Sequence, residues 1–203
     1  MMQLVGMLDS PYVRRVALSL RLLGLAFDHR SVSVFSTFEQ FRAINPVVKA
    51  PTLVCDDGTL LMDSSLIIDY AETIAGRSLM PSASAERQHA LRVLGLALAA
   101  CEKTIQIVYE RNLRPLEKQH APWVDRVRGQ LHAAYAGLEA EMPRMPSMDG
   151  EAAMGQAALT SAVAWSFTQL MISDVIAPAD CPLLAAFAAE AEKLPAFLAL
   201  PQA

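Results

Sequence analysis

Cysteine is scarce in this sequence. Its 203 residues include three cysteines, Cys55, Cys101 and Cys181, which are far apart and form no Cys-x-x-Cys pair. This number and spacing argue against a disulfide framework and predict reduced, mostly buried thiols. The four histidines show no metal-ligand spacing with one another or with cysteine. We therefore expect no structural or catalytic metal.

An excess of basic charge is also absent. Lysine and arginine number 17 against 21 acidic residues, and the two signs are interspersed. No basic field is available to hold a phosphate backbone, so we expect no nucleic-acid partner. Neither a glycine-rich dinucleotide motif nor a P-loop occurs, which leaves a nucleotide cofactor without support. The N-terminus lacks the pattern of a secretory signal, which predicts a cytoplasmic location.

One long stretch without charge, residues 152–173, is long enough to cross a bilayer. Neither flank has a basic anchor, and polar side chains interrupt the stretch. These side chains are Gln156, Thr160, Ser161, Ser166, Thr168, Gln169 and Ser173. We therefore expect no membrane segment and interpret the stretch as the central helix of a bundle, buried all round.

Apolar residues make up 53% of the chain, enough for one large core or two modest ones. Hydrophobic periodicity and turn residues predict the order βαβαββα in the first eighty residues. The expected strands are residues 3–8, 27–34, 52–55 and 60–62, and the expected helices follow Ser10, Ser36-Thr37 and Asp63. Asp57-Gly58 predicts a hairpin between the last two strands.

Strand signals disappear after Ala83. Long helical patterns follow over residues 84–112, 121–142 and 152–174, with shorter ones near the C-terminus. The change in composition at residues 79–81 predicts a domain boundary, and the proline-rich residues 142–150 predict a loop between helices. We therefore expect an α/β N-terminal domain, residues 1–78, and an all-α C-terminal domain, residues 84–203.

Ser10 stands where the first strand gives way to a helix. Its hydroxyl is placed to cap the helix, and Pro11 suits the first helical position. The simplest interpretation of Ser10 is therefore a helix cap and nothing more. Arg14 and Arg15, however, occupy the first turn, where the helix dipole disfavours cations. This unusual charge placement raises the alternative of an anion site at the helix start.

Four motifs, in order along the chain, resemble those of the cytosolic glutathione transferase family. They are residues 10–12 (SPY), residues 45–53 (NPVVKAPTL), residues 63–64 (DS) and residues 79–81 (LMP). The order and spacing carry the resemblance, which covers essentially the whole chain and is closest to bacterial, Ser-type members. It implies a thioredoxin-like N-terminal domain, a helical-bundle C-terminal domain, a homodimer and glutathione as co-substrate.

The resemblance also assigns residues to the glutathione site. Pro51 falls at the family's cis-proline, and Ala50 then offers its backbone N–H and C=O to the cysteinyl part of glutathione. Ser64 and the helix N–H groups suit the γ-glutamyl carboxylate, and Asp63 suits the ammonium. Lys49 is expected to reach the glycyl carboxylate.

These residues also have plain structural interpretations. Pro51 is compatible with an ordinary trans proline at a strand start, and Asp63 and Ser64 with a simple N-cap. Asp63 is shorter than the Glu or Gln usual in the family, so its contact with the ammonium is longer or lost. The family's Ser/Thr-x-x-Asp capping box, compared here at Thr160, has Val163 in place of Asp.

The implied chemistry is activation of the glutathione thiol for attack on a small electrophile, with detoxification as the implied role. A free thiol has a pKa of about 8.5, and the thiolate is the nucleophile. A hydroxyl donor at Ser10 together with the helix N-terminus stabilises that anion. Ser10 is thus a donor to sulfur, because no His/Asp arrangement that would make it a hydrolase nucleophile is visible.

The electrophile is expected between Leu8 and the first long helix of the second half, near Tyr109 and Arg111. Arg14 is a further group within reach of a co-substrate, although a solvated surface arginine is the simpler interpretation. Conjugation, isomerisation of a maleyl-type substrate, dehalogenation and ether cleavage stay open, because pocket shape selects among them. A non-catalytic binding or scaffold protein is the alternative, and a disulfide reductase would need Cys in place of Ser10.

Overall fold

A computed structural model of the chain describes residues 1–145, 150–151 and 154–202. The backbone clusters into two compact units. The first unit comprises residues 1–79 with the described residues of 149–154 and 193–203, and the second comprises those of 80–148 and 155–192. The predicted domains, residues 1–78 and 84–203, stay a prediction.

A four-stranded sheet with the order β2-β1-β3-β4 forms the centre of the first unit. The strands are β1 (Met2–Val5), β2 (Phe27–Arg30), β3 (Thr52–Val54) and β4 (Leu60–Met62), and the helices are α1 (Pro11–Leu22), α2 (Phe38–Ile44) and α3 (Ser64–Ala75). β1 pairs with β2 in parallel and with β3 antiparallel, and β3 and β4 form the predicted hairpin. The predicted order βαβαββα, that of a thioredoxin-like domain, is confirmed.

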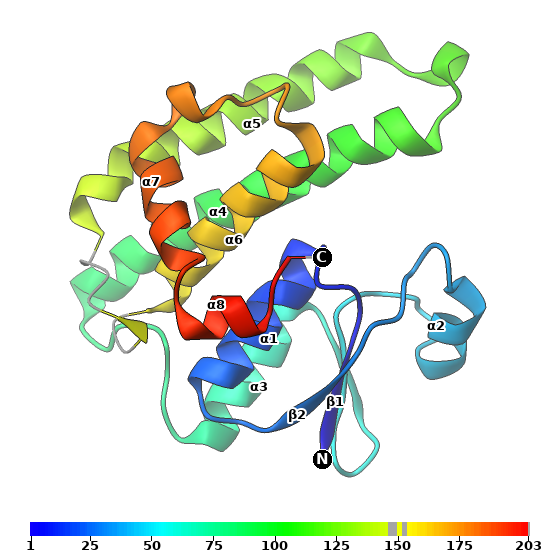
Figure 1. Cartoon of the computed structure of the whole chain (residues 1–203), viewed down its shortest axis with the longest axis vertical. Helices are drawn as coiled ribbons and strands as arrows, with labels where there is room; N and C mark the ends of the chain where they lie inside the picture. The colour runs from blue at the N-terminus through cyan, green and yellow to red at the C-terminus, as the bar shows by residue number, and fades with distance from the viewer. Residues whose placement is uncertain (146–149, 152–153, 203) are drawn as a thin grey trace. The chain divides into compact units, whose positions relative to one another are not determined.

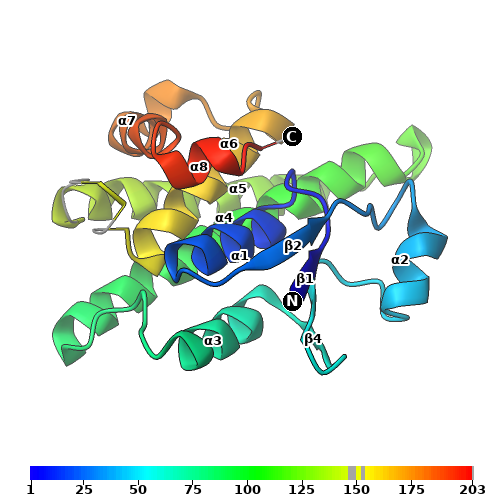
Figure 2. The same cartoon turned by 60° about the horizontal axis from the view of Figure 1, so that its bottom comes forward.

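Side chains alternate across this sheet, so its two faces have separate cores. Leu4 of β1 packs with Val16 of α1 and Ile67 of α3, and all three are fully buried. Val5, the next residue of β1, packs on the other face with Phe41 of α2. Figure 1 shows α1 and α3 side by side, and in Figure 2 α2 lies on the opposite side of β1. The two helix starts that are expected to bind glutathione therefore belong to neighbouring helices, α1 and α3.

Two strands are shorter than predicted. β1 ends at Val5 instead of residue 8, and β2 ends at Arg30 instead of residue 34. Gly6 ends β1 because its φ of 143° leaves the extended region, although its N–H still donates to the Arg30 carbonyl oxygen at 3.1 Å. The residues from Met7 to Ser10 therefore form a loop that connects the sheet to α1.

The second unit is helical. Its elements are α4 (Ser84–Leu113), η1 (Leu116–Lys118), α5 (Ala121–Glu141), η2 (Met142–Arg144), α6 (Gln156–Ile172), η4 (Pro178–Asp180) and α7 (Pro182–Ala191). The predicted limits of the first two long helices are within one residue of those observed. Of the predicted loop 142–150, residues 142–144 form η2, and residues 146–149 lie outside the described residues. The short helix α8 (Pro195–Ala199) belongs to the first unit.

Helix α6 is buried on almost every side, as predicted from its lack of charge. Its neighbour α5 contributes Tyr135, whose hydroxyl donates to the Ala164 carbonyl oxygen at 2.9 Å. α6 begins at Gln156 after the N-cap Gly155. The family's capping-box motif was compared with the residues at Thr160, and this was wrong because Thr160 lies inside the helix. Among the described helices, none combines the length and apolar character that a bilayer span requires.

The three cysteines all lie in the described part of the chain and are buried, as predicted. No disulfide links any two of them. Burial raises the pKa of the Cys55 thiol, and it raises that of the Cys181 thiol to about 11. Both thiols are therefore protonated at neutral pH and are poor nucleophiles.

Candidate functional site

The loop between β1 and α1 is held in place by its backbone. His29 Nε2 donates to the Gly6 carbonyl oxygen at 2.8 Å, and the Gly6 N–H donates to β2. At the other end of the loop, the Ser10 N–H donates to the Met7 carbonyl oxygen at 3.2 Å. These hydrogen bonds fix the position at which Ser10 enters α1.

Ser10 is the N-cap residue of α1 and Pro11 is its first helical residue, as predicted. The Ser10 carbonyl oxygen accepts from Arg14 N at 2.9 Å, but the Ser10 side chain makes no capping hydrogen bond. The prediction of a hydroxyl cap was therefore wrong. Because no described residue bonds to it, the hydroxyl is available to a ligand at the positive end of the helix dipole.

The Ala50–Pro51 peptide bond is cis, as the resemblance implied. Two buried polar side chains hold the loop that precedes it. Asn45 Nδ2 donates to Thr52 Oγ1 at 2.8 Å, and Thr52 Oγ1 donates to the Lys49 carbonyl oxygen at 2.7 Å. The Lys49 side chain itself is exposed. The Ala50 backbone is thus supported from within the first unit, while Lys49 is free to reach outward.

Gly6 allows this loop to approach β1 and α1 closely. A Cβ atom at Gly6 would lie 2.5 Å from Val13 Cγ2 and 3.3 Å from Ala50 Cβ. The first distance is too short for any side chain at this position. Gly6, which precedes the loop that leads to Ser10, therefore lies against Ala50 in the cis-proline loop.

Asp63 and Ser64 form the start of α3. Asp63 is the N-cap, and its Oδ1 accepts from Ser65 N at 2.9 Å. Its φ of 75° is unusual for a residue other than glycine, a strain of about 1–3 kcal/mol of the kind that clusters at functional sites. Ser64 is 5% exposed. The structure thus confirms the simple capping role of Asp63 and leaves its second carboxylate oxygen for a ligand.

Arg14 is fully buried, so the prediction of a solvated surface arginine was wrong. Its Nε donates to the Leu200 carbonyl oxygen at 3.0 Å, and its guanidinium lies 5.3 Å from the centre of the Phe197 ring. A cation at that distance from an aromatic face is attracted by the ring. Arg14 therefore connects α1 to the segment around α8.

Arg15 is 1% exposed and extends from α1 to the start of α3. Its Nη1 donates to Ser64 Oγ at 2.9 Å and to Ser65 Oγ at 3.1 Å. Sequence reasoning did not include Arg15 among the site residues. The signal that pointed to it was the presence of two cations in the first turn of a helix, where the dipole disfavours them.

The residues predicted to line the electrophile pocket belong to two different units. Leu8 belongs to the first unit and packs against its core. In the second unit, Tyr109 is 43% exposed, and Arg111 donates two hydrogen bonds to the carboxylate oxygens of Asp174 at 2.9 and 2.8 Å. These hydrogen bonds lower the pKa of Asp174 and raise that of Arg111. The electrophile pocket stays a prediction.

Known proteins resemble this chain in sequence and in structure. Residues 4–79 match the family profile described as glutathione S-transferase, N-terminal domain. YibF, a glutathione S-transferase-like protein of Escherichia coli K12, is 26% identical over 139 residues, which are 68% of each chain.

Two solved structures from Pseudomonas fluorescens Pf-5 are similar over nearly their full length. One is a glutathione transferase family member with bound glutathione, 29% identical, with a TM-score of 0.86 over 100% of both chains. The other, described in the same way but with bound S-(propanoic acid)-glutathione, is 28% identical, with a TM-score of 0.83 over 100% of this chain and 98% of its own. These comparisons show that the chain has the glutathione S-transferase fold and that its residues 4–79 match the N-terminal domain of that family.

Proposed function

We propose that this chain is a glutathione S-transferase in which the Ser10 hydroxyl donates a hydrogen bond to the glutathione thiolate. The observation that carries the proposal is a serine hydroxyl without a hydrogen-bond partner among the described residues, at the start of a 12-residue helix and beside a cis-proline loop. A donor to the anion favours the charged form and lowers the pKa of the bound thiol, and the helix N-terminus acts in the same direction. More of the thiol is then present as the nucleophile at neutral pH.

The rest of glutathione is assigned to groups of the same unit. The backbone N–H and C=O of Ala50 pair with the cysteinyl part, and Lys49 attracts the glycyl carboxylate. Asp63 uses Oδ1 for its helix cap, and Oδ2 is left for the γ-glutamyl ammonium. The Ser64 hydroxyl and the N-terminus of α3 receive the γ-glutamyl carboxylate.

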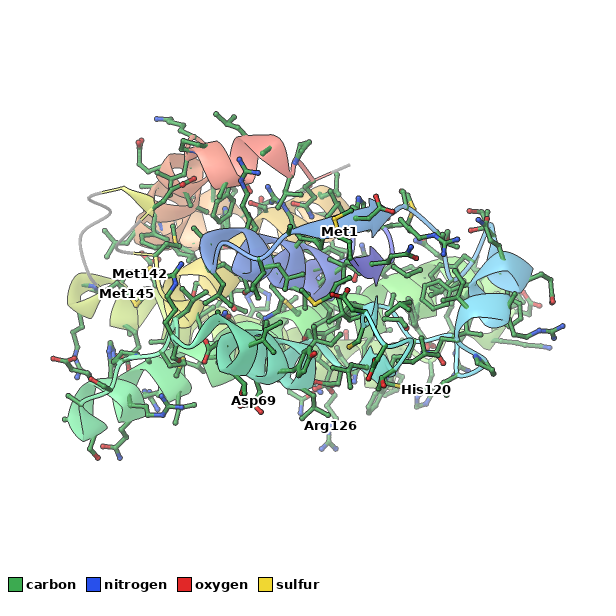
Figure 3. All side chains as sticks on the ribbon, turned by 90° about the horizontal axis from the view of Figure 1, so that it is seen from below. Met1, Asp69, His120, Arg126, Met142 and Met145 are labelled. Carbon is green, nitrogen blue, oxygen red and sulfur yellow. The ribbon has the colours of Figure 1, made fainter. Side chains whose placement is uncertain are left out.

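Replacing Ser64 or Asp63 by alanine is expected to raise the glutathione dissociation constant about tenfold or more. Hydrogen bonds to charged groups are worth about 1.5–3 kcal/mol, which corresponds to that factor. Isothermal titration calorimetry measures it directly. Asp69→Asn is a matched control, because Asp69 is an exposed carboxylate on the outer side of α3 (Figure 3). If both alanine variants bind like the parent, these residues are not part of the site.

The class of reaction is tested with glutathione and a set of electrophiles: an activated aryl halide, a maleyl-type acid, a haloalkane and an aryl ether. We expect turnover of at least one of them, because a stabilised thiolate is a nucleophile toward all four. If glutathione raises the melting temperature while none of them reacts, a non-catalytic binding protein is favoured. If glutathione has no effect on the melting temperature, the proposed function is wrong.

We further propose a cytoplasmic homodimer. Several large apolar side chains of the helices are exposed in the single chain, among them Leu66 and Ile74 of α3 and Leu91 of α4, with exposed fractions of 66%, 44% and 53%. Light scattering at micromolar concentration is expected to give twice the chain mass of 22.0 kDa. A single species of 22.0 kDa across that concentration range would contradict the proposal.

A further inference from the structure

Arg15 is a buried cation at the expected γ-glutamyl end of the site. It comes from α1 and contacts two hydroxyls at the start of α3, at 2.9 Å for Ser64 Oγ and 3.1 Å for Ser65 Oγ. Arg15 and Ser64 are 1% and 5% exposed, whereas Ser65 is exposed to solvent. A buried cation thus lies directly behind the hydroxyl that is expected to face the ligand.

This contact determines what the Ser64 hydroxyl is able to do. A guanidinium has donors and no acceptor, whereas a serine hydroxyl has one donor and two acceptor positions. Ser64 Oγ must therefore accept from Arg15, which leaves its own O–H to donate elsewhere. With Arg15 in place, the hydroxyl proton points away from the guanidinium and is available to an anion at the start of α3.

The buried guanidinium also acts through its charge. A carboxylate that accepts from Ser64 lies one hydrogen bond farther from Arg15 than the hydroxyl does. Charges interact more strongly in the protein interior than in water, because screening is weaker there. A neutral side chain at position 15 would remove both the fixed orientation of the hydroxyl and this attraction.

We propose that Arg15 is a positioning residue for the γ-glutamyl carboxylate of glutathione, which it holds through the Ser64 hydroxyl. This inference rests on the proposed function. It adds to that function a residue that contacts no substrate atom. Arg15 instead determines how much more tightly the enzyme binds a ligand with the γ-glutamyl carboxylate than a ligand without it.

The test compares two ligands that differ only in this carboxylate. Glutathione has it, and 4-aminobutyryl-cysteinylglycine lacks it while keeping the amine, the thiol and the glycyl group. Calorimetry gives both dissociation constants for the parent and for Arg15→Met, in which an apolar side chain of similar length replaces the cation. The ratio followed is the dissociation constant of the analogue divided by that of glutathione. It is expected to fall about tenfold in Arg15→Met, because the dissociation constant of glutathione rises while that of the analogue stays the same.

Arg14→Met is the matched control. It removes the neighbouring buried arginine, which contacts Leu200, Gln202 and Phe197. A general loss of structure raises both dissociation constants together, so the ratio in Arg14→Met is expected to equal that of the parent. An unchanged ratio in Arg15→Met, with both affinities reduced alike, would overturn the proposal and leave the proposed function standing.

Arg15→Lys covers the case in which Arg15→Met does not fold. Its ammonium keeps the charge but lacks the planar fork, and it is expected to reach one hydroxyl, so the ratio should fall only about threefold. A ratio equal to that of the parent in this variant would also overturn the proposal. A parent that binds glutathione and the analogue equally would overturn it as well, whereas a parent that binds neither ligand would remove the proposed function itself.

Discussion

Replacing Ser10 by alanine is expected to lower turnover with an activated aryl halide about ten- to a hundredfold at neutral pH, while glutathione still binds. The Ser10 hydroxyl donates to the charged form of the thiol, so its loss moves the pKa of the bound thiol upward. A lost hydrogen bond worth about 1–3 kcal/mol corresponds to about one to two pKa units. Turnover should recover partly as the pH rises and the thiol ionises without help.

Ultraviolet absorbance of the thiolate, followed against pH with glutathione bound and no electrophile present, measures this shift. The parent should titrate at lower pH than Ser10→Ala. Tyr12→Phe is the comparison, because Tyr12, the second residue of α1, also carries a hydroxyl. If Tyr12→Phe shifts the titration and Ser10→Ala does not, Tyr12 activates the sulfur and Ser10 only marks the start of the helix.

Replacing Gly6 by alanine is expected to reduce the free energy of unfolding by about 2–6 kcal/mol. The added Cβ would lie 2.5 Å from Val13 Cγ2, and valine has little freedom to move its methyl groups aside. Overpacking of this kind costs about 1–3 kcal/mol. The φ of 143° adds a backbone penalty of about 1–3 kcal/mol for a residue with a side chain.

Urea denaturation measures the loss, and Gly24→Ala is its control. Gly24 also has a positive φ, of 75°, but a Cβ added there would have no atom of the described residues within 4 Å, so only the backbone penalty of about 1–2 kcal/mol applies. Val13→Ala in the Gly6→Ala background should recover part of the loss, because it removes the clashing methyl group. Equal losses for Gly6→Ala and Gly24→Ala would show that the approach of Val13 is not what requires glycine.

Local features predicted much of the first unit. The order of strands and helices followed from periodicity and turn residues, and α1 and α3 begin where Pro11 and Asp63 indicated. The ends of β1 and β2 were wrong because they depend on pairing between strands. At Gly6, a change of φ and a contact with Val13 end the strand, and neither is visible in the alternation of apolar residues.

The two arginines of α1 show why the site was only partly predictable. Their position in the first turn broke a charge rule, but their partners are distant in sequence: Leu200 lies 186 residues from Arg14, and Ser64 lies 49 residues from Arg15. Sequence alone gave no reason to bury either side chain. By contrast, the residues assigned through the resemblance lie in short motifs, each made of residues that are adjacent in the sequence.

The contact of Arg14 with Leu200 and Phe197 determines when the first unit can finish folding during synthesis on the ribosome. Residues 193–202 belong to the same compact unit as residues 1–79, yet they are synthesised after all of residues 80–192. A nascent chain that has released only its first eighty residues therefore exposes Arg14 without these two partners. The first unit reaches its final form only after the second has emerged, so the part of the protein made first is among the last to be completed.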